Sequence, residues 1–378
     1  MKQKILLAAD TYYPKVDGTL RFMEEFIQRA SDFEISLLVP NLGKNHKMKV
    51  HKTTFLEPSK RIKLSGYPSL KFSLKNFKKI KEAIKESEIV FVQGPALISY
   101  LSIYYGKKYK KKVVFYMHVI AWELFAKFLP PLVNKLFFKI IKRGSIYFYN
   151  KCDLILVPYR ALEINLKSEG VKTKMEIAKL GVNINMFSPS SDKAKSKEKI
   201  GINPNKKVIG YVGRISKEKN VEIILEAFRK LKDQQNHHLL IVGDGPEEQK
   251  KKFHEIPNCT ITGFVKDVEK YLQAMDVFVM ASLTETTSLA TLEAMSCGLP
   301  VIASKVGFIK NYISKNHNGL FFARNSSSML AIKIEKILHD SSLSKKLGNN
   351  ARKTVAYSFS WERSINRIKR LLISIFYD

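Results

Sequence analysis

The chain has 378 residues, more than one hydrophobic core usually supports, so two domains are expected. Hydrophobic residues make up 45% of it and charged residues 26%, which excludes collagen-like, low-complexity and disordered chains. The formal net charge of +31 favours polyanionic partners such as nucleic acid, anionic lipid or nucleotide-linked substrates, although a lysine-rich proteome produces the same excess without any function.

The first apolar run, residues 5–9, ends at Asp10 and is too short for the core of a signal peptide, so a buried first strand is expected there. No stretch of 18 apolar residues is free of charge, and therefore no transmembrane helix is predicted. Cys152, Cys259 and Cys297 are scattered without a Cys-x-x-Cys pair. That pattern argues against a disulfide framework and a thiolate zinc site, and favours a reducing compartment.

Short apolar, β-branched runs alternate with amphipathic helical segments along both halves of the chain. This alternation predicts parallel βαβ units and hence an α/β fold. We expect two Rossmann-like parallel-sheet domains face to face, with a ligand cleft beyond the carboxyl ends of their strands. The strands are expected at 5–9, 35–39, 89–92, 113–117 and 154–157 in the first half, and at 208–213, 239–242, 276–280 and 300–303 in the second.

The polar passage at 188–199 predicts a linker, giving an N-terminal Rossmann-like domain at 1–190 and a C-terminal Rossmann-like domain at 191–378. Ser360 is the expected N-cap of a last amphipathic helix at about 361–376. That helix can pack back on the N-terminal domain.

The segment 282–300 follows a predicted strand and begins with polar residues. Thr286, Thr287 and Ser288 are capping residues ahead of 289–296, so a helix should start there with unpaired amides that suit a diphosphate. Glu285 lies just before this helix and Glu293 lies inside it. Their carboxylates can accept hydrogen bonds from vicinal hydroxyls, as in a sugar or ribose, or they simply favour the helix dipole and solvent.

Residues 213–220 directly follow another predicted strand. Arg214 can bind a phosphate with two donors, and Lys219 can add a compact charge across a turn. Together they would neutralise a leaving diphosphate, although in so basic a chain the pair can also be ordinary surface charge.

These motifs, in this order, resemble the family-4 retaining glycosyltransferases of the GT-B fold, and the resemblance covers nearly the whole chain. It rests on Glu285 and Glu293 with seven residues between them, and on four further segments. The segments are 10–18, 180–187, 213–220 and 243–247, with 294–300 continuing the helix motif.

The resemblance implies roles for individual residues. Arg214 and Lys219 match the pair that binds the donor diphosphate, Glu293 the acid at the ribose, and Glu285 the acid at the transferred sugar. The amides around Thr287, Ser288 and Leu289 would meet sugar hydroxyls and phosphate. Two matches are expected in the other half of the chain. His118 matches a histidine near the reacting sugar, or it is simply a partly buried histidine at a strand end. Gly18 matches a glycine in a loop close to the donor, or it simply marks a turn.

Two departures stand out: Asp17 where many relatives have a glycine before Gly18, and Ser288 near a position where many have glycine. The family mechanism uses the departing phosphate to help remove the acceptor proton, so no dedicated base and no metal or other cofactor is expected beyond the nucleotide sugar.

The stretch 121–150 bears on the acceptor, which the family binds mainly through its N-terminal domain. It contains eight aromatic and five basic residues against a single acid, Glu123. This mixture is typical of a segment that lies in a lipid interface, or of core aromatics with a solvated rim of lysines. The aromatic residues are Trp122, Phe125, Phe128, Phe137, Phe138, Tyr147, Phe148 and Tyr149, and the basic ones are Lys127, Lys135, Lys139, Lys142 and Arg143.

The sequence therefore predicts a hexosyltransferase that moves a sugar, with retention, from a nucleotide-diphosphate donor to a lipid or lipid-linked acceptor. It is expected to be cytoplasmic and peripherally bound to the inner face of an anionic membrane. One alternative is an enzyme of the same fold with a soluble sugar or sugar-phosphate acceptor. A more distant one is a basic nucleic-acid-binding protein, for which the chain carries no recognisable reading motif.

Overall fold

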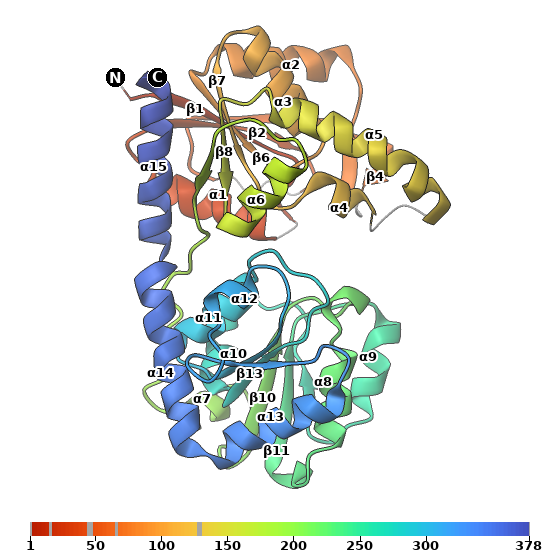
Figure 1. Cartoon of the computed structure of the whole chain (residues 1–378), viewed down its shortest axis with the longest axis vertical. Helices are drawn as coiled ribbons and strands as arrows, with labels where there is room; N and C mark the ends of the chain where they lie inside the picture. The colour runs from red at the N-terminus through yellow and green to blue at the C-terminus, as the bar shows by residue number, and fades with distance from the viewer. Residues whose placement is uncertain (1, 15–16, 44–47, 65–66, 127–130, 378) are drawn as a thin grey trace. The chain divides into compact units, whose positions relative to one another are not determined.

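The computed structural model describes residues 2–14, 17–43, 48–64, 67–126 and 131–377, without the side chains of 60–64, 67–68, 125–126 and 131–136. Its contacts divide the chain into two compact units. The first unit is Met1–Lys179 with Glu362–Asp378, and the second unit is Leu180–Trp361. Each unit has a parallel sheet with helices on both of its faces, as the alternating apolar and amphipathic segments predict (Figure 1).

The first unit contains a seven-stranded sheet in the order β3-β2-β1-β6-β7-β8-β9. Its central strands are almost wholly apolar because helices cover both sides. The strands are β1 (Lys4–Ala9), β2 (Glu34–Pro40), β3 (Lys52–Leu56), β6 (Ile89–Gln93), β7 (Lys112–Tyr116), β8 (Leu154–Val157) and β9 (Met175–Ile177), beside the antiparallel pair β4 (Pro58–Leu64) and β5 (Tyr67–Leu70). The helices are α1 (Gly18–Arg29), α2 (Leu74–Lys85), α3 (Leu97–Lys108), α4 (Ala121–Ala126), α5 (Pro131–Tyr149), α6 (Arg160–Ser168) and α15 (Trp361–Tyr377).

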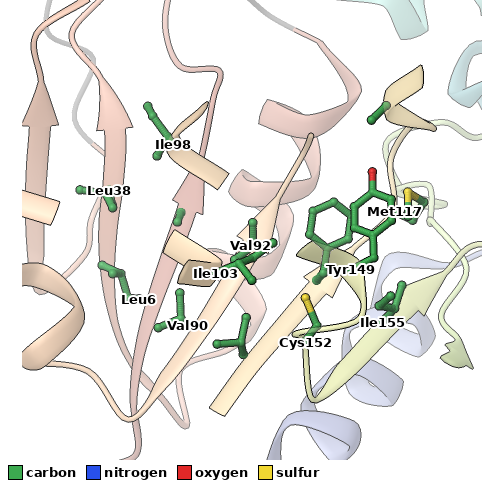
Figure 2. Close-up of a cluster of buried hydrophobic side chains, with 14 of the residues drawn as sticks. Leu6, Leu38, Val90, Val92, Ile98, Ile103, Met117, Tyr149, Cys152 and Ile155 are labelled. Carbon is green, nitrogen blue, oxygen red and sulfur yellow. The ribbon is translucent and has the colours of Figure 1, made fainter. Parts of the chain in front are cut away.

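The core of the first unit joins one face of this sheet to the helices α3 and α5 (Figure 2). Val90 and Val92 of β6 lie beside Ile103 of α3, and all three are fully buried. Tyr149, at the end of α5, is also fully buried, and its ring centroid lies 5.0 Å from that of Phe115. The end of α5 is therefore anchored in the core.

The second unit contains a six-stranded sheet in the order β12-β11-β10-β13-β14-β15. The strand order reverses between β10 and β13, and open α/β sheets bind ligands at such a switch point, beyond the carboxyl ends of the strands. The strands are β10 (Lys207–Val212), β11 (His237–Val242), β12 (Cys259–Ile261), β13 (Val277–Met280), β14 (Val301–Ser304) and β15 (Leu320–Phe322). The helices are α7 (Lys193–Glu198), η1 (Lys217–Lys219), α8 (Glu222–Arg229), η2 (Gln234–Asn236), α9 (Glu247–His254), α10 (Val268–Ala274), α11 (Leu289–Ser296), α12 (Ile309–Tyr312), α13 (Ser327–His339) and α14 (Ser341–Ser358).

The division between the units differs from the expected one at residue 190. The passage expected to be a linker instead forms α7 within the second unit, because the buried ammonium of Lys197 lies 2.8 Å from the Asp276 carboxylate and donates to a backbone carbonyl. The last helix, α15, groups with the first unit, where Arg367 pairs with Glu176 at 2.9 Å.

Candidate functional site

Two glycine-containing loops meet at the carboxyl ends of β10 and β11. Gly213 and Gly243 both have a φ of +147°, and a Cβ on Gly243 would lie 2.0 Å from the Gly213 carbonyl oxygen. Only glycine fits this close approach of two backbones. The Gly213 amide also donates to the Val242 carbonyl at 2.9 Å, so the position of the next residue, Arg214, is set by the backbone.

The Arg214 side chain is exposed, and its Nη2 lies 2.9 Å from Oε1 of Glu218. Its carbonyl accepts a 3.0 Å hydrogen bond from the buried phenol of Tyr211. Burial raises the pKa of Tyr211 most, the Glu285 carboxylate raises it further, and Arg214 lowers it. Arg214 and Glu285 therefore both lie near the Tyr211 phenol and shift its pKa in opposite directions.

Lys219, the last residue of η1, faces Glu285. The Nζ of Lys219 lies 2.6 Å from Oε1 of Glu285, and Ser282 donates to the same oxygen at 2.8 Å. The Glu285 side chain is only 9% exposed. The structure thus brings the predicted residues Arg214, Lys219 and Glu285 into one charged cluster beyond the carboxyl ends of β10 and β13.

The backbone of 285–287 is fixed from the neighbouring loop after β14. A Cβ on Gly307 would lie 1.7 Å from the Glu285 carbonyl oxygen, so this position requires glycine. The Phe308 amide donates to the Thr286 carbonyl, and the Tyr312 hydroxyl donates to the Thr287 carbonyl, both at 2.8 Å. These contacts hold Glu285 in a defined place.

The helix α11 begins at Leu289, as the pattern of capping residues predicts, but its start differs from the expected cap. Ser288 has a left-handed backbone with φ 57°, and among the described residues its side chain gives α11 no cap; it shares a 2.8 Å hydrogen bond with the Thr291 hydroxyl instead. The positive end of the helix dipole therefore lies at the switch point without a side-chain oxygen from Ser288. Glu293 lies about one turn further along and is 5% exposed.

The side chain of Thr287 is also notable. Its hydroxyl is buried and has no hydrogen-bond partner among the described residues. An unpaired buried hydroxyl is costly unless a ligand or water completes it.

His118 and Gly18 belong to the first unit. His118 follows β7, is half-buried, and its Nε2 lies 2.8 Å from Oε1 of Gln93. Burial lowers the pKa of His118 to about 3, so its imidazole is neutral. Gly18 is the first residue of α1, and Asp17 caps that helix by accepting a hydrogen bond from the Leu20 amide at 2.9 Å. The roles of His118 and Gly18 at the donor stay predictions.

Sequence reasoning missed several residues that shape the cluster. Glu218 lies within the motif around Arg214, and an acid four residues after an arginine was a usable signal. Gly307 and Tyr312 gave none, because their contacts with 285–287 depend on where the sheet places two separate loops.

Metal-binding groups are a separate question. In the described part of the chain, no three His, Cys, Asp or Glu side chains gather as ligands for a metal ion. The expectation that transfer needs no metal stays a prediction.

Comparison with known proteins identifies the family and the fold. The model of the family "Glycosyltransferase Family 4" matches residues 18–186, and that of "Glycosyl transferases group 1" matches residues 192–354. Alpha-monoglucosyldiacylglycerol synthase from Acholeplasma laidlawii is 26% identical over 85% of each chain, and the enzyme of the same name from Streptococcus pneumoniae is 24% identical over 84% of this chain and 75% of its own.

Among solved structures, that of Anabaena HepE in complex with UDP matches with a TM-score of 0.78 at 17% identity, covering 98% of this chain and all of that one. The fold and family expected from the sequence motifs are confirmed. The chain belongs to the family-4 glycosyltransferases of the GT-B fold and is a hexosyltransferase.

Proposed function

We propose that the enzyme transfers a sugar, with retention, from a nucleotide-diphosphate donor to a lipid or lipid-linked acceptor at an anionic membrane surface. The observation that carries the proposal is the cluster of Arg214, Lys219 and Glu285 at the start of α11. In it, Arg214 and Lys219 bind the diphosphate with the helix dipole, Glu285 binds the transferred sugar, and Glu293 binds the ribose. The backbone amides at Thr287, Ser288 and Leu289 meet the remaining oxygens.

Donor binding exchanges the partners of both cations. A diphosphate replaces the Glu218 carboxylate at Arg214 and the Glu285 carboxylate at Lys219, because phosphate carries more charge and offers more acceptor oxygens. The Glu285 carboxylate is then free to accept hydrogen bonds from sugar hydroxyls.

In the transfer step the bond between the anomeric carbon and the phosphate oxygen breaks. The acceptor hydroxyl attacks from the same face of the sugar and forms the new glycosidic bond, and the departing phosphate takes its proton. The negative charge that develops on the diphosphate is stabilised by Arg214, Lys219 and the amino terminus of α11.

The donor is tested by binding and turnover. UDP is bound by the HepE structure, so UDP-sugars are the first candidates here, with GDP-sugars as comparison. We expect a UDP-sugar to raise the melting temperature, since a ligand of the folded state stabilises it. Release of UDP should fall at least tenfold in Glu293→Ala, whereas the control Glu226→Ala, on the exposed face of α8, keeps the wild-type rate. Full activity of Glu293→Ala would contradict the assignment.

The membrane part of the proposal rests on α5. Phe137, Ile140 and Tyr147 are 44%, 61% and 57% exposed and lie on one helix face because they are three and seven residues apart. Exposed Lys139 and Arg143 flank them. Apolar side chains beside cations are typical of a helix at a lipid headgroup layer.

The remaining aromatic residues of 121–150 divide differently. Trp122 and Tyr149 are buried, and Phe138 and Phe148 pack against the core, so these four are structural. The side chains of Phe125, Phe128, Lys127 and Lys135 lie outside the described residues. None of the helices in the described ranges has the length and apolar character needed to cross a membrane.

Sedimentation with vesicles tests this surface. We expect binding to phosphatidylglycerol vesicles but little to phosphatidylcholine, and a loss of at least tenfold in the triple variant Phe137→Ser, Ile140→Ser, Tyr147→Ser. Ile332→Ser with Tyr357→Ser is the matched control, since these side chains of the second unit are 61% and 73% exposed. The two relatives named as diacylglycerol-modifying synthases support a lipid acceptor. Equal activity on a soluble sugar without vesicles would favour the soluble-acceptor alternative.

A further inference from the structure

Gln93 is a buried polar residue at the end of an otherwise apolar strand of the first unit. It ends β6, a central strand whose other four residues are fully buried and apolar, and it is itself 1% exposed. Its amide nitrogen has no hydrogen-bond partner among the described residues. Burying an unpaired amide nitrogen costs free energy, so Gln93 is expected to have a role other than packing.

The amide oxygen of Gln93 has one partner of chemical interest. It lies 2.8 Å from Nε2 of His118, so Nε2 carries the proton and donates it to the oxygen. The imidazole is further held by rings on two sides, with centroids 5.3 Å from Phe22 of α1 and 4.6 Å from Tyr116 of β7. A neutral imidazole with a proton on Nε2 has its lone pair on Nδ1.

The charges on the surrounding elements are engaged elsewhere. Burial is the cause that lowers the pKa of His118. Titratable groups on these elements each have a partner. Asp10 caps α3, and Asp17 caps α1. Glu24 accepts a hydrogen bond from Tyr13, Glu25 pairs with Arg29, and Tyr116 donates to the Ala178 carbonyl.

We propose that Gln93 is a positioning residue that holds His118 in the tautomer protonated at Nε2, so that Nδ1 accepts a hydrogen bond from a hydroxyl of the bound sugar or acceptor. This inference rests on the proposed function, in which His118 lies near the reacting sugar. An amide is suited to the task because it orients the ring without charging it, whereas a carboxylate would stabilise the imidazolium and turn Nδ1 into a donor.

The tautomer is tested without turnover. Histidine-selective ¹⁵N NMR of the full chain, with the His118 signals identified from a His118→Asn variant, should show one neutral tautomer protonated at Nε2 from pH 5.5 to 8. Gln93→Met should convert it to a mixture of tautomers. A wild-type ring protonated at Nδ1, or a tautomer unchanged in Gln93→Met, would overturn the proposal even if no donor is ever found.

Kinetics give the second readout. Gln93→Met should lower kcat roughly tenfold to a hundredfold with little change in the KM for the donor, the usual effect of losing an orienting partner. The kcat of Gln93→Glu should be low near pH 6 and should recover at higher pH, as the imidazolium loses its proton. The pH profile of the wild-type enzyme should lack this rise. The control Ser102→Ala removes a different buried polar group of the first unit, one that also has no hydrogen-bond partner in the described part of the chain, and should leave the pH profile unchanged. Equal, pH-independent losses in both Gln93 variants would show a merely structural role.

Discussion

Lys219 and Glu285 form an ion pair from which water is largely excluded, since their side chains are 21% and 9% exposed. Lys219→Met leaves the carboxylate without its cation, and we expect the free energy of unfolding to fall by about 3 kcal/mol, because breaking a buried pair strands a charge. The double variant Lys219→Met, Glu285→Gln should recover most of this stability. Urea unfolding of the four members of the cycle measures it.

The same cycle separates stability from donor binding. Lys219→Met and the double variant should both bind a nucleotide sugar poorly, because each lacks the cation that holds the diphosphate. The double variant should do so although it is stable. The exposed pair of Lys252 with Glu222 provides the control, and Lys252→Met should unfold at the wild-type urea concentration. A single variant Lys219→Met as stable as the wild type would mean that Glu285 is fully hydrated.

Sequence reasoning found the charged residues of the site because each follows a strand end, where chain order alone predicts proximity. Arg214 follows β10, and Glu285 follows β13, the strand next to it in the sheet. It was wrong about the cap of α11, because the Ser288 hydroxyl has a better partner in Thr291. Tyr312 could not be predicted, since its hydrogen bond crosses between two loops.

At the scale of elements, α3 depends on a side chain from a distant strand end. One oxygen of Asp10, directly after β1, accepts from the Ile98 amide at 2.8 Å, and the other accepts from the Ala96 amide at 3.1 Å and the Ser99 amide at 3.3 Å. Asp10→Ala should therefore lower the free energy of unfolding by about 1–2 kcal/mol, the usual effect of losing a cap. Asp10→Asn should lose less, and urea unfolding compares them.

Asp10 also makes this cap sensitive to pH. Burial raises the pKa of Asp10 from 3.8 to about 6, against the opposing effect of its hydrogen bonds. The pKa of Asp10 is higher in the folded protein than in the unfolded chain, so protonation of Asp10 stabilises the folded state. This contribution to stability is complete below pH 3.8 and is lost as the pH rises through 6. The stability of Asp10→Asn relative to wild type should therefore increase between pH 4 and pH 6.5. A constant difference over that range would contradict the raised pKa.

The buried inner strands of the two sheets were predictable and the edge strands were not. β8 has the bounds that its apolar run predicts, and β1 begins one residue earlier. β3, β9, β12 and β15 lie at the edges of the sheets; the last three have only three residues each, and β3 begins with polar Lys52, Thr53 and Thr54. The sequence predicts a linker where α7 lies, because the only apolar residue of this helix is one alanine. In the structure, a buried ion pair rather than apolar packing attaches α7 to the second unit.

For the whole molecule, two half-buried histidines predict instability in acid. Burial lowers the pKa of His118 to about 3 and that of His238, which bonds Thr260 at 2.9 Å, to about 4. Since both lie below the ordinary value of 6.5, their stabilisation is present above pH 6.5 and is lost as the pH falls toward 3. The melting temperature should fall steadily below pH 6.5, and His238→Gln should flatten this slope. An unchanged slope would show that His238 is free to ionise in the folded state.

The first unit is made from both ends of the chain, and this has a consequence for synthesis. The ribosome translates all of Leu180–Trp361 before it reaches Glu362, where the chain returns to the first unit. Ile365, Ile368 and Leu372, fully buried in the folded enzyme, are therefore translated only after the whole second unit. The nascent N-terminal sheet therefore keeps an apolar flank uncovered until the whole second unit has been translated.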